Sequence, residues 1–158
     1  MQKSITKTAS QTKKIGENLA KEIVKQKPGN TALVLGLHGD LGAGKTTFLQ
    51  GFARGLEIKE KVLSPTFIIL KKFQIPTNKV PQKRRLSVLR YGYFYHIDCY
   101  RLKNEKDLEV LGFKEIMLNP KNIIAIEWPE RISKILPKDM ISINFKHGAG
   151  NQRRLIIR

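Results

Sequence analysis

The spacing of apolar residues predicts that the first third of the chain forms a helix, a buried strand and a second helix. Between residues 8 and 27 apolar side chains recur every four positions, at Ile15, Leu19 and Ile23. This is the period of a helix face, and Pro28-Gly29 ends it. Residues 31–37 are almost all apolar, as in a strand covered on both faces of a parallel sheet, and a helix is expected from about 45 to 56.

Strands and helical segments alternate through the rest of the chain. Apolar or alternating runs predict strands at 67–73, 91–98, 123–126, 140–145 and 153–157. Helical segments are expected near 105–118 and after Pro129. The 158 residues suffice for one core, so a single α/β domain covering 1–158 is predicted. No apolar run approaches the roughly 18 residues that a membrane-spanning helix needs.

A complete phosphate-binding motif lies between the first predicted strand and the helix that follows it. Gly39-Asp40-Leu41-Gly42-Ala43-Gly44-Lys45-Thr46 matches G-x-x-x-x-G-K-[ST], and Thr47 follows it. Its backbone N–H groups would surround phosphate oxygens, Lys45 would reach the outer phosphates, and the Thr46 hydroxyl would bind Mg²⁺. A glycine turn that binds nothing is the alternative, but a buried strand and a helix flank the motif as its function requires. The sequence therefore predicts a three-layer P-loop NTPase-like fold with a central, mostly parallel sheet.

Two acidic residues stand at the ends of predicted strands, where ligands of open α/β sheets gather. Glu127 follows the apolar run 123–126, as in Walker B elements, and Asp98 ends the strand before it. We predict that both take part in catalysis and that Glu127 binds Mg²⁺ together with Thr46. A surface acid and a strand-end ion pair are the respective alternatives. His96 shares a strand face with Asp98 and is expected to pack or to form a hydrogen bond.

The segment Ser64-Pro65-Thr66-Phe67 lies between the P-loop helix and the next strand. Nucleotide switches place there a threonine that senses Mg²⁺ or the γ-phosphate, so Thr66 is predicted to act with the two acids. An ordinary Ser-Pro turn is the alternative. The guanine signature N-K-x-D is missing, because no acid follows Asn78-Lys79 at the required position. ATP is therefore the expected nucleotide.

The chain is strongly basic, with 30 Lys and Arg against 13 Asp and Glu and a net charge of +17. Seven basic residues and no acid lie at about 71–90, namely Lys71, Lys72, Lys79, Lys83, Arg84, Arg85 and Arg90. Prolines in this basic insertion favour a long loop or an irregular hairpin. The other 23 basic residues still outnumber the acids, so the positive charge belongs to the whole chain. A solvated basic surface and contact with nucleic acid are both compatible with it.

Four motifs in this order resemble those of the TsaE (YjeE) family: G-D-L-G-A-G-K-T-T, S-P-T-F, Y-H-I-D-C-Y-R-L and I-E-W-P-E-R. The resemblance covers nearly the whole chain. It implies the ATPase component of the bacterial machinery that installs threonylcarbamoyl on the adenosine beside the tRNA anticodon. In that family the transfer is carried out by TsaD, paired with TsaB, and the ATPase resets the pair. The basic insertion is longer than the connection expected from the family.

Carried over by motif, Lys45 and Thr46 hold the triphosphate and Mg²⁺, Asp98 and Glu127 are the acids of the site, and Thr66 belongs to the switch. Trp128 follows the acid as it does in the family and is assigned no chemistry. A weak ATPase that a TsaB–TsaD-like complex activates is expected, and tRNA would be contacted indirectly or through the basic surface.

The residues also bear on the compartment and on rival functions. A single cysteine, Cys99, and the absence of an apolar signal region predict a cytoplasmic protein without a membrane segment. No arginine lies inside the P-loop or switch motifs, and Arg101 is the nearest motif arginine. A small P-loop kinase acting on a metabolite is an alternative function. A basic nucleic-acid-binding module with a regulatory nucleotide site is another.

Overall fold

A computed structural model describes residues 1–63, 69–76, 91–102 and 104–158. The predicted switch residue Thr66 and residues 77–90 of the basic insertion lie outside the described residues. The first half of the chain contains β1 (Gln2–Thr6), α1 (Ala9–Ile23), β2 (Leu33–His38), α2 (Lys45–Gly55) and β3 (Leu70–Gln74). The second half contains β4 (Tyr93–Asp98), α4 (Lys106–Glu109), α5 (Phe113–Leu118), β5 (Asn122–Glu127), the 3₁₀ helix η2 (Pro129–Ile135), β6 (Ile141–His147) and β7 (Arg153–Ile157).

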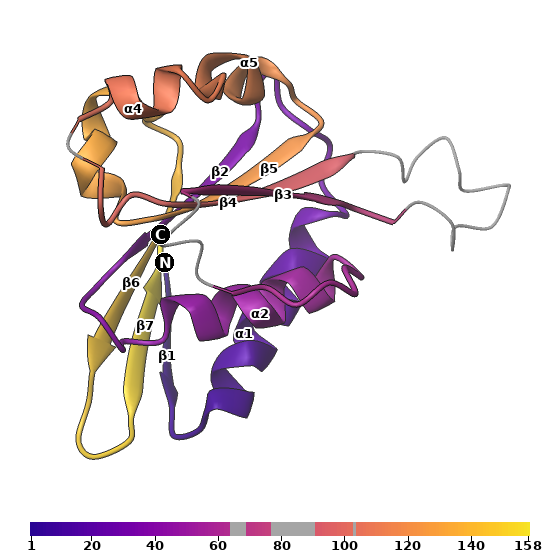
Figure 1. The fold of residues 1–158 in the computed structure, drawn as a ribbon. Helices are drawn as coiled ribbons and strands as arrows, with labels where there is room; N and C mark the ends of the chain where they lie inside the picture. The colour runs from indigo at the N-terminus through magenta and orange to yellow at the C-terminus, as the bar shows by residue number, and fades with distance from the viewer. Residues whose placement is uncertain (64–68, 77–90, 103) are drawn as a thin grey trace, which may run out of the picture.

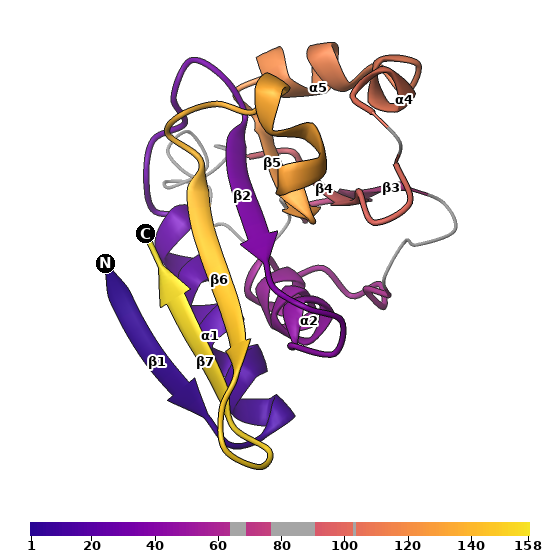
Figure 2. The same ribbon diagram turned by 90° about the vertical axis from the view of Figure 1, so that its left-hand side faces the viewer.

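The strands of the described ranges form one seven-stranded sheet in the order β1-β7-β6-β2-β5-β4-β3 (Figure 2). The four central strands, β6, β2, β5 and β4, run parallel to one another. The remaining strands pair antiparallel, β3 at one edge and β7 with β1 at the other. The predicted α/β fold is confirmed, with its parallel part confined to the centre. Because β2, β5 and β4 are parallel neighbours, their carboxyl ends meet on one side of the sheet.

Helices cover both faces of the sheet, which gives three layers (Figure 1). Helices α1 and α2 lie on one face, over a core that includes Phe48, Phe52 and Phe94. Segments α4, α5 and η2 lie on the other face, over a second core that includes Ile97 and Ile124. All six residues of β5 are buried, and the four between Asn122 and the final acid form a continuous apolar run, as expected of a strand covered on both faces. No helix in the described ranges is both long and apolar enough to cross a membrane.

Helices α1 and α2 contact each other closely and are also joined by charge. Gly51 lies so close to α1 that a Cβ atom there would overlap the carbonyl oxygen of Lys13. The largely buried carboxylate of Glu17 accepts hydrogen bonds from Lys21 on its own helix and from Arg54 on α2. These two hydrogen bonds lower the pKa of Glu17 from 4.5 to about 2. The Glu17 carboxylate therefore links the two helices through an ion pair with Arg54.

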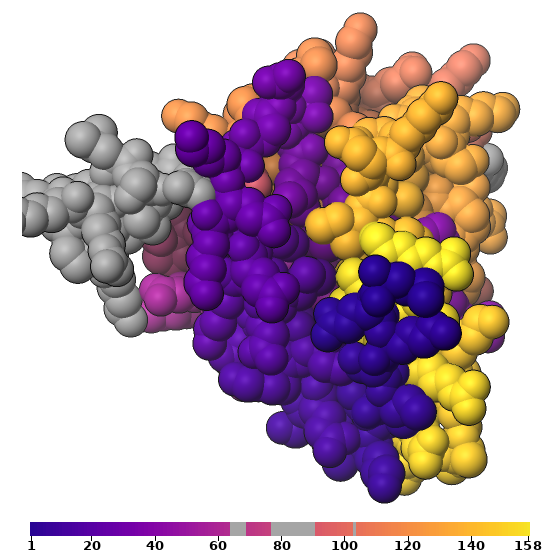
Figure 3. Space-filling model, turned by 180° about the vertical axis from the view of Figure 1, so that it is seen from behind, coloured from indigo at the N-terminus to yellow at the C-terminus, as the bar shows by residue number. Residues whose placement is uncertain are grey.

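The two edges of the sheet compare differently with the prediction from the sequence. Strand β1 was not predicted, because it is a short, mostly exposed edge strand without an apolar run. It pairs with β7, so the two ends of the chain lie side by side (Figure 3). At the opposite edge, Lys71 and Lys72 belong to β3, where they pair with His96 and Tyr95 of β4. Residues 71–74 of the basic insertion thus belong to the sheet, in agreement with the strand predicted at 67–73, and residues 77–90 lie outside the described residues.

Candidate functional site

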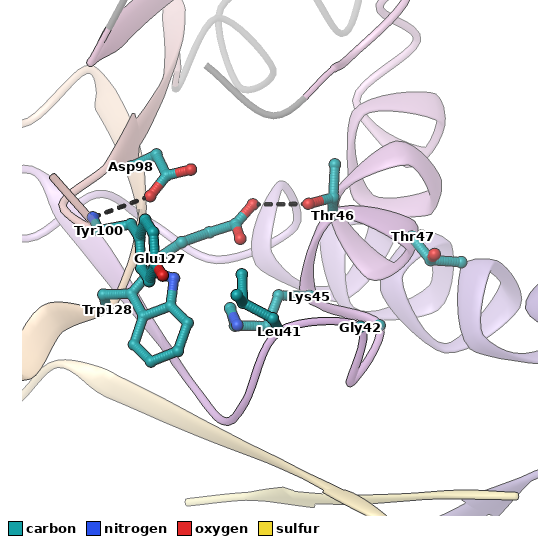
Figure 4. Close-up of a pocket in the computed structure, with 10 residues that line it drawn as sticks. Leu41, Gly42, Lys45, Thr46, Thr47, Asp98, Tyr100, Glu127 and Trp128 are labelled. Carbon is teal, nitrogen blue, oxygen red and sulfur yellow. Dashed lines mark hydrogen bonds between the residues drawn. The ribbon is translucent and has the colours of Figure 1, made fainter. Parts of the chain in front are cut away.

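A pocket of about 320 Å³ opens where β4 and β5 end and α2 begins (Figure 4). Its walls are Leu41, Gly42, Gly44, Lys45, Thr46, Thr47, Asp98, Tyr100, Glu127 and Trp128. The structure therefore brings both predicted acids to the predicted phosphate-binding loop. The other predicted loop residues, Gly39, Asp40 and Ala43, complete the loop without lining this pocket.

The conformation of the loop requires glycine at two positions. Gly39 has a φ of +135°, and a Cβ atom there would overlap the carbonyl oxygen of Phe145 on β6. Gly44 has a φ of +102° and immediately precedes the first residue of α2. The first N–H groups of a helix have no partner within it, so the start of α2 is suited to bind an anion.

The Lys45 side chain is buried within the loop, with 4 % of its surface exposed. Its Nζ donates to the carbonyl oxygens of Gly39, at 2.6 Å, and Asp40, at 3.0 Å. The same atom lies 4.1 Å from the centre of the Trp128 ring. Burial lowers the pKa of the Lys45 ammonium, and the carboxylates of Glu127 and Asp98 oppose that shift. An ammonium has three donors, so one is left for an anionic ligand.

The sequence did not predict that Trp128 contacts Lys45. Trp128 has a left-handed backbone, with a φ of 61°, and its backbone N–H donates to the carbonyl oxygen of Leu37 at 3.3 Å. A φ above zero is uncommon for a bulky residue. The turn after β5 places the indole beside Lys45, and no sequence motif indicates this conformation. Trp128 therefore forms a wall of the site in addition to any packing role.

The side chain of Glu127 joins β5 to α2 and to β4. Its Oε1 accepts hydrogen bonds from Thr46 Oγ1, at 3.0 Å, and from His96 Nε2, at 2.9 Å. Asp98 is the register partner of Glu127 on β4, and its Oδ1 accepts from the Tyr100 N–H at 3.0 Å. Both acids are at most 4 % exposed, so Glu127 is not a surface residue. Thr47 points away from the two acids (Figure 4).

The residues of the pocket can bind a metal cation whose remaining ligands come from a bound phosphate group. Among the residues that the structure describes, no group of three or more His, Cys, Asp or Glu side chains could hold a metal ion. The predicted pair, the Thr46 hydroxyl and the Glu127 carboxylate, supplies oxygen ligands of the kind that Mg²⁺ prefers. Since Mg²⁺ is commonly bound by one or two carboxylates plus substrate phosphates, these two residues suit it only when phosphates supply the remaining oxygens.

A second pocket of about 330 Å³ adjoins the first at Gly42, Gly44 and Thr47. Its other walls come from both ends of the chain: Lys7, Thr8, Ala9, Thr12, Asn151 and Arg153. These residues are neutral or basic. Sequence reasoning missed this pocket, because none of these positions belongs to a motif and only the pairing at the β1–β7 edge brings them together.

The fold and the loop between β2 and α2 define a P-loop NTPase-like α/β protein. The structure resembles the crystal structure of YdiB from Bacillus subtilis with a TM-score of 0.70 and 30 % sequence identity, covering 99 % of this chain and 83 % of that one. The family model for the threonylcarbamoyl adenosine biosynthesis protein TsaE matches residues 6–156. The chain belongs to the TsaE family.

Curated relatives agree with this assignment. The tRNA threonylcarbamoyladenosine biosynthesis protein TsaE of Bacillus subtilis is 37 % identical over 129 residues, which are 82 % of this chain and 69 % of the relative. That of Borreliella burgdorferi is 39 % identical over 111 residues, 70 % of each chain. That of Rickettsia prowazekii is 33 % identical over 144 residues, 90 % of this chain and 87 % of the relative. The predicted resemblance is confirmed, and it places the chain in tRNA threonylcarbamoyladenosine biosynthesis.

Proposed function

We propose that this TsaE-family chain binds Mg·ATP in the pocket and hydrolyses it weakly on its own. Hydrolysis would support threonylcarbamoylation of the adenosine beside the tRNA anticodon. The observation that supports this most directly is the convergence of Lys45 and Thr46 of α2, Asp98 of β4 and Glu127 of β5 on one pocket. A phosphate-binding loop needs such acids for turnover, because binding alone orients neither a metal nor a water.

The positions of the two pockets suggest how the nucleotide would lie. The outer phosphates would face Lys45, Thr46 and the acids, since these residues share the first pocket. The nucleoside would then extend into the adjoining pocket, whose walls, as far as the chain is described, offer no carboxylate to the N–H donors of guanine. This agrees with ATP as the nucleotide.

The two acids would act on the metal and the attacking water. Bound Mg²⁺ would neutralise charge on the phosphates. Thr46 and Glu127 would hold the ion, and Asp98 would orient water with them. The hydrogen bond from the Tyr100 N–H would hold the Asp98 carboxylate in place for this role. Thr66, as a switch residue that acts with the acids, is part of the same proposal.

A partner complex of the TsaB–TsaD type would complete the site. No arginine lines the first pocket among the described residues, so the site would gain from a cation or a closing surface supplied by another protein. Contact with tRNA would be indirect or through the basic surface of this chain. The proposed work on tRNA places the protein in the cytoplasm.

Calorimetric titration of Mg·ATP into Lys45→Ala tests nucleotide binding directly. Because Lys45 supplies the charged donor to the outer phosphates, affinity should fall by at least about 10–100-fold in a folded variant. Lys59→Ala, which changes an exposed lysine beyond α2, is the matched control and should bind normally. Undiminished affinity in Lys45→Ala would rule out this pocket as the ATP site.

The product of the reaction separates this function from that of a small metabolite kinase. ATP hydrolysis releases ADP and free phosphate, whereas a kinase yields a phosphorylated acceptor. Release of stoichiometric free phosphate in the presence of cell metabolites would support the ATPase. A basic nucleic-acid-binding module would instead bind tRNA at physiological salt in the absence of partner proteins and without turnover.

A further inference from the structure

His96 lies beneath the proposed ATP site without contacting the pocket. It is at the centre of β4, fully buried, and it is not among the pocket walls. His96 pairs in register with Ala125, two residues before Glu127 on the neighbouring strand β5. Since side chains two residues apart share a strand face, the imidazole and the Glu127 carboxylate project on the same face of the sheet. That face is the one covered by α2.

The hydrogen bonds around Glu127 give the imidazole a defined role. Nε2 of His96 lies 2.9 Å from Oε1 of Glu127, and the same oxygen accepts from Thr46 Oγ1 at 3.0 Å. Within the described chain, Oε2 of Glu127 accepts no hydrogen bond. The two donors, His96 on β4 and Thr46 on α2, hold the carboxylate through its Oε1 atom. The Oε2 atom therefore remains available to a ligand in the pocket.

The other ring nitrogen shows which way this hydrogen bond runs. Nδ1 of His96 is buried and has no hydrogen-bond partner among the described residues. A carboxylate only accepts, so Nε2 must carry the proton of the shared bond. A proton on Nδ1 would be a buried donor without an acceptor, which is costly. The ring is therefore best accommodated as the Nε2–H tautomer, a fixed donor to Glu127.

We propose that His96 is a positioning residue, which orients Glu127 for ATP hydrolysis and never contacts the nucleotide. The role rests on the proposed function, because it acts only through Glu127. Hydrogen-bond partners behind a metal-binding side chain orient it and raise its effectiveness. Thr46 donates a hydrogen bond to the same oxygen of Glu127 from the pocket side. When the Thr46 hydroxyl binds the metal ion instead, His96 would remain as the donor that holds Glu127.

Two substitutions at His96 separate orientation of Glu127 from packing. His96→Leu fills a similar volume without a donor, whereas His96→Gln keeps an N–H donor at a similar reach. With the partner pair present, His96→Leu should lower kcat by about 10–100-fold and change the Kd of ATP by less than about 3-fold. His96→Gln should recover most of kcat. Ile97→Val, equally buried on the opposite face of the same strand, is the matched control.

A double substitution and a spectroscopic measurement complete the test. In a Glu127→Gln background, His96→Leu should cause no further loss, since residues that act as a unit are non-additive. The ¹⁵N shifts of the imidazole in the nucleotide-free protein should show a protonated Nε2 and an unprotonated Nδ1. This measurement does not depend on activity, and it decides the question if His96→Leu fails to fold.

The outcomes distinguish this inference from the proposed function. Normal hydrolysis by Glu127→Gln would overturn both. Impaired Glu127→Gln with normal His96→Leu would overturn the positioning role alone. An Nδ1–H tautomer, or full additivity in the double variant, would also overturn it.

Discussion

At the scale of single residues, the two acids of the site are supported in different ways. Glu127 is joined by side chains to α2 and to β4, through Thr46 and His96. Asp98 is joined to the backbone of the turn that follows it, through the Tyr100 N–H. Glu127 therefore depends on the packing of three elements, β5, α2 and β4.

Asp98→Asn and Glu127→Gln should retain nucleotide and lose most hydrolysis. Each substitution removes a negative charge but keeps the shape of the side chain. The acids act on metal and water as charge develops in the transition state, so turnover should fall by about 100-fold or more. Affinity for ATP should change far less. The measurements are ATP affinity by calorimetry and phosphate release with partners supplied. If both variants turn over ATP normally, these carboxylates are structural.

The sequence predicted most of the residues that the structure gathers at the pocket, but neither Tyr100 and Trp128 nor the contacts between these residues. Gly39 to Thr47, Asp98 and Glu127 follow from a motif and from acids at strand ends, because both patterns are local. The hydrogen bond from His96 to one chosen oxygen of Glu127 depends on the register of β4 against β5, which is set by long-range packing. The left-handed backbone of Trp128 likewise has no local signal.

At the scale of elements, α1 and α2 behave as one unit. A glycine contact brings the helices together at Gly51, and the carboxylate of Glu17 joins Lys21 of α1 to Arg54 of α2. Because α2 begins at Lys45, the position of the phosphate-binding loop depends on this helix pair. The buried strands and long helices were predictable from period and apolar runs. Strand β1 was not, since exposed edge strands lack both signals.

Ionisation of Glu17 should make the stability of the folded protein depend on pH between about 4.5 and about 2. Its pKa is lowered from 4.5 to about 2 in the folded protein, so its stabilising contribution is complete above pH 4.5 and disappears as pH falls to about 2. Glu17→Gln should lower the Tm at neutral pH, and the difference from wild type should shrink across that window. Glu22→Gln, exposed on the same helix, is the control. A Tm difference that does not change with pH would contradict the ion pairing.

The antiparallel pair β3–β4 changes how the basic insertion should be tested. Deleting 71–90 would remove part of the sheet, because Lys71 and Lys72 belong to β3. Neutralising the five basic residues beyond this strand avoids that problem. They are Lys79, Lys83, Arg84, Arg85 and Arg90.

If these residues contact phosphates of tRNA, the five substitutions should reduce the slope of log K against log salt by at most about 3.5–4.5. The measurement is tRNA binding at several salt concentrations. A matched control neutralises five exposed lysines elsewhere, namely Lys59, Lys61, Lys114, Lys134 and Lys138. An equal effect from both sets would assign tRNA binding to overall charge, and an unchanged slope in both would assign the charge to solvated surface.

At the scale of the whole molecule, the proposed site lies at the carboxyl ends of the central strands and is open on one side. The described walls provide a lysine, two threonines and two carboxylates, but no arginine. Arg101 follows β4 in an exposed turn and does not line the pocket. A protein surface that covers the pocket would exclude water and supply further charge.

The isolated chain should therefore hydrolyse ATP slowly, and a TsaB–TsaD-type complex should accelerate it strongly. A cation supplied in trans increases the rate by about 10³–10⁵-fold in other P-loop systems. Phosphate release is measured for the chain alone and with the pair at saturating concentration. Fast turnover by the chain alone, unaffected by the pair, would contradict this mechanism.

The pairing of the two chain ends has a consequence for synthesis on the ribosome. Among the strands that the structure describes, β1 is made before all the others, whereas its partner β7 follows all of them in the chain. Gly39 likewise packs against the backbone at Phe145, so the phosphate-binding loop gains its final neighbour only when β6 has emerged. A nascent chain that stops before residue 141 would contain the complete phosphate-binding motif but would lack β6, the strand that Gly39 packs against. The proposed nucleotide binding would then be acquired only after the β6–β7 hairpin has been made and has docked on the sheet.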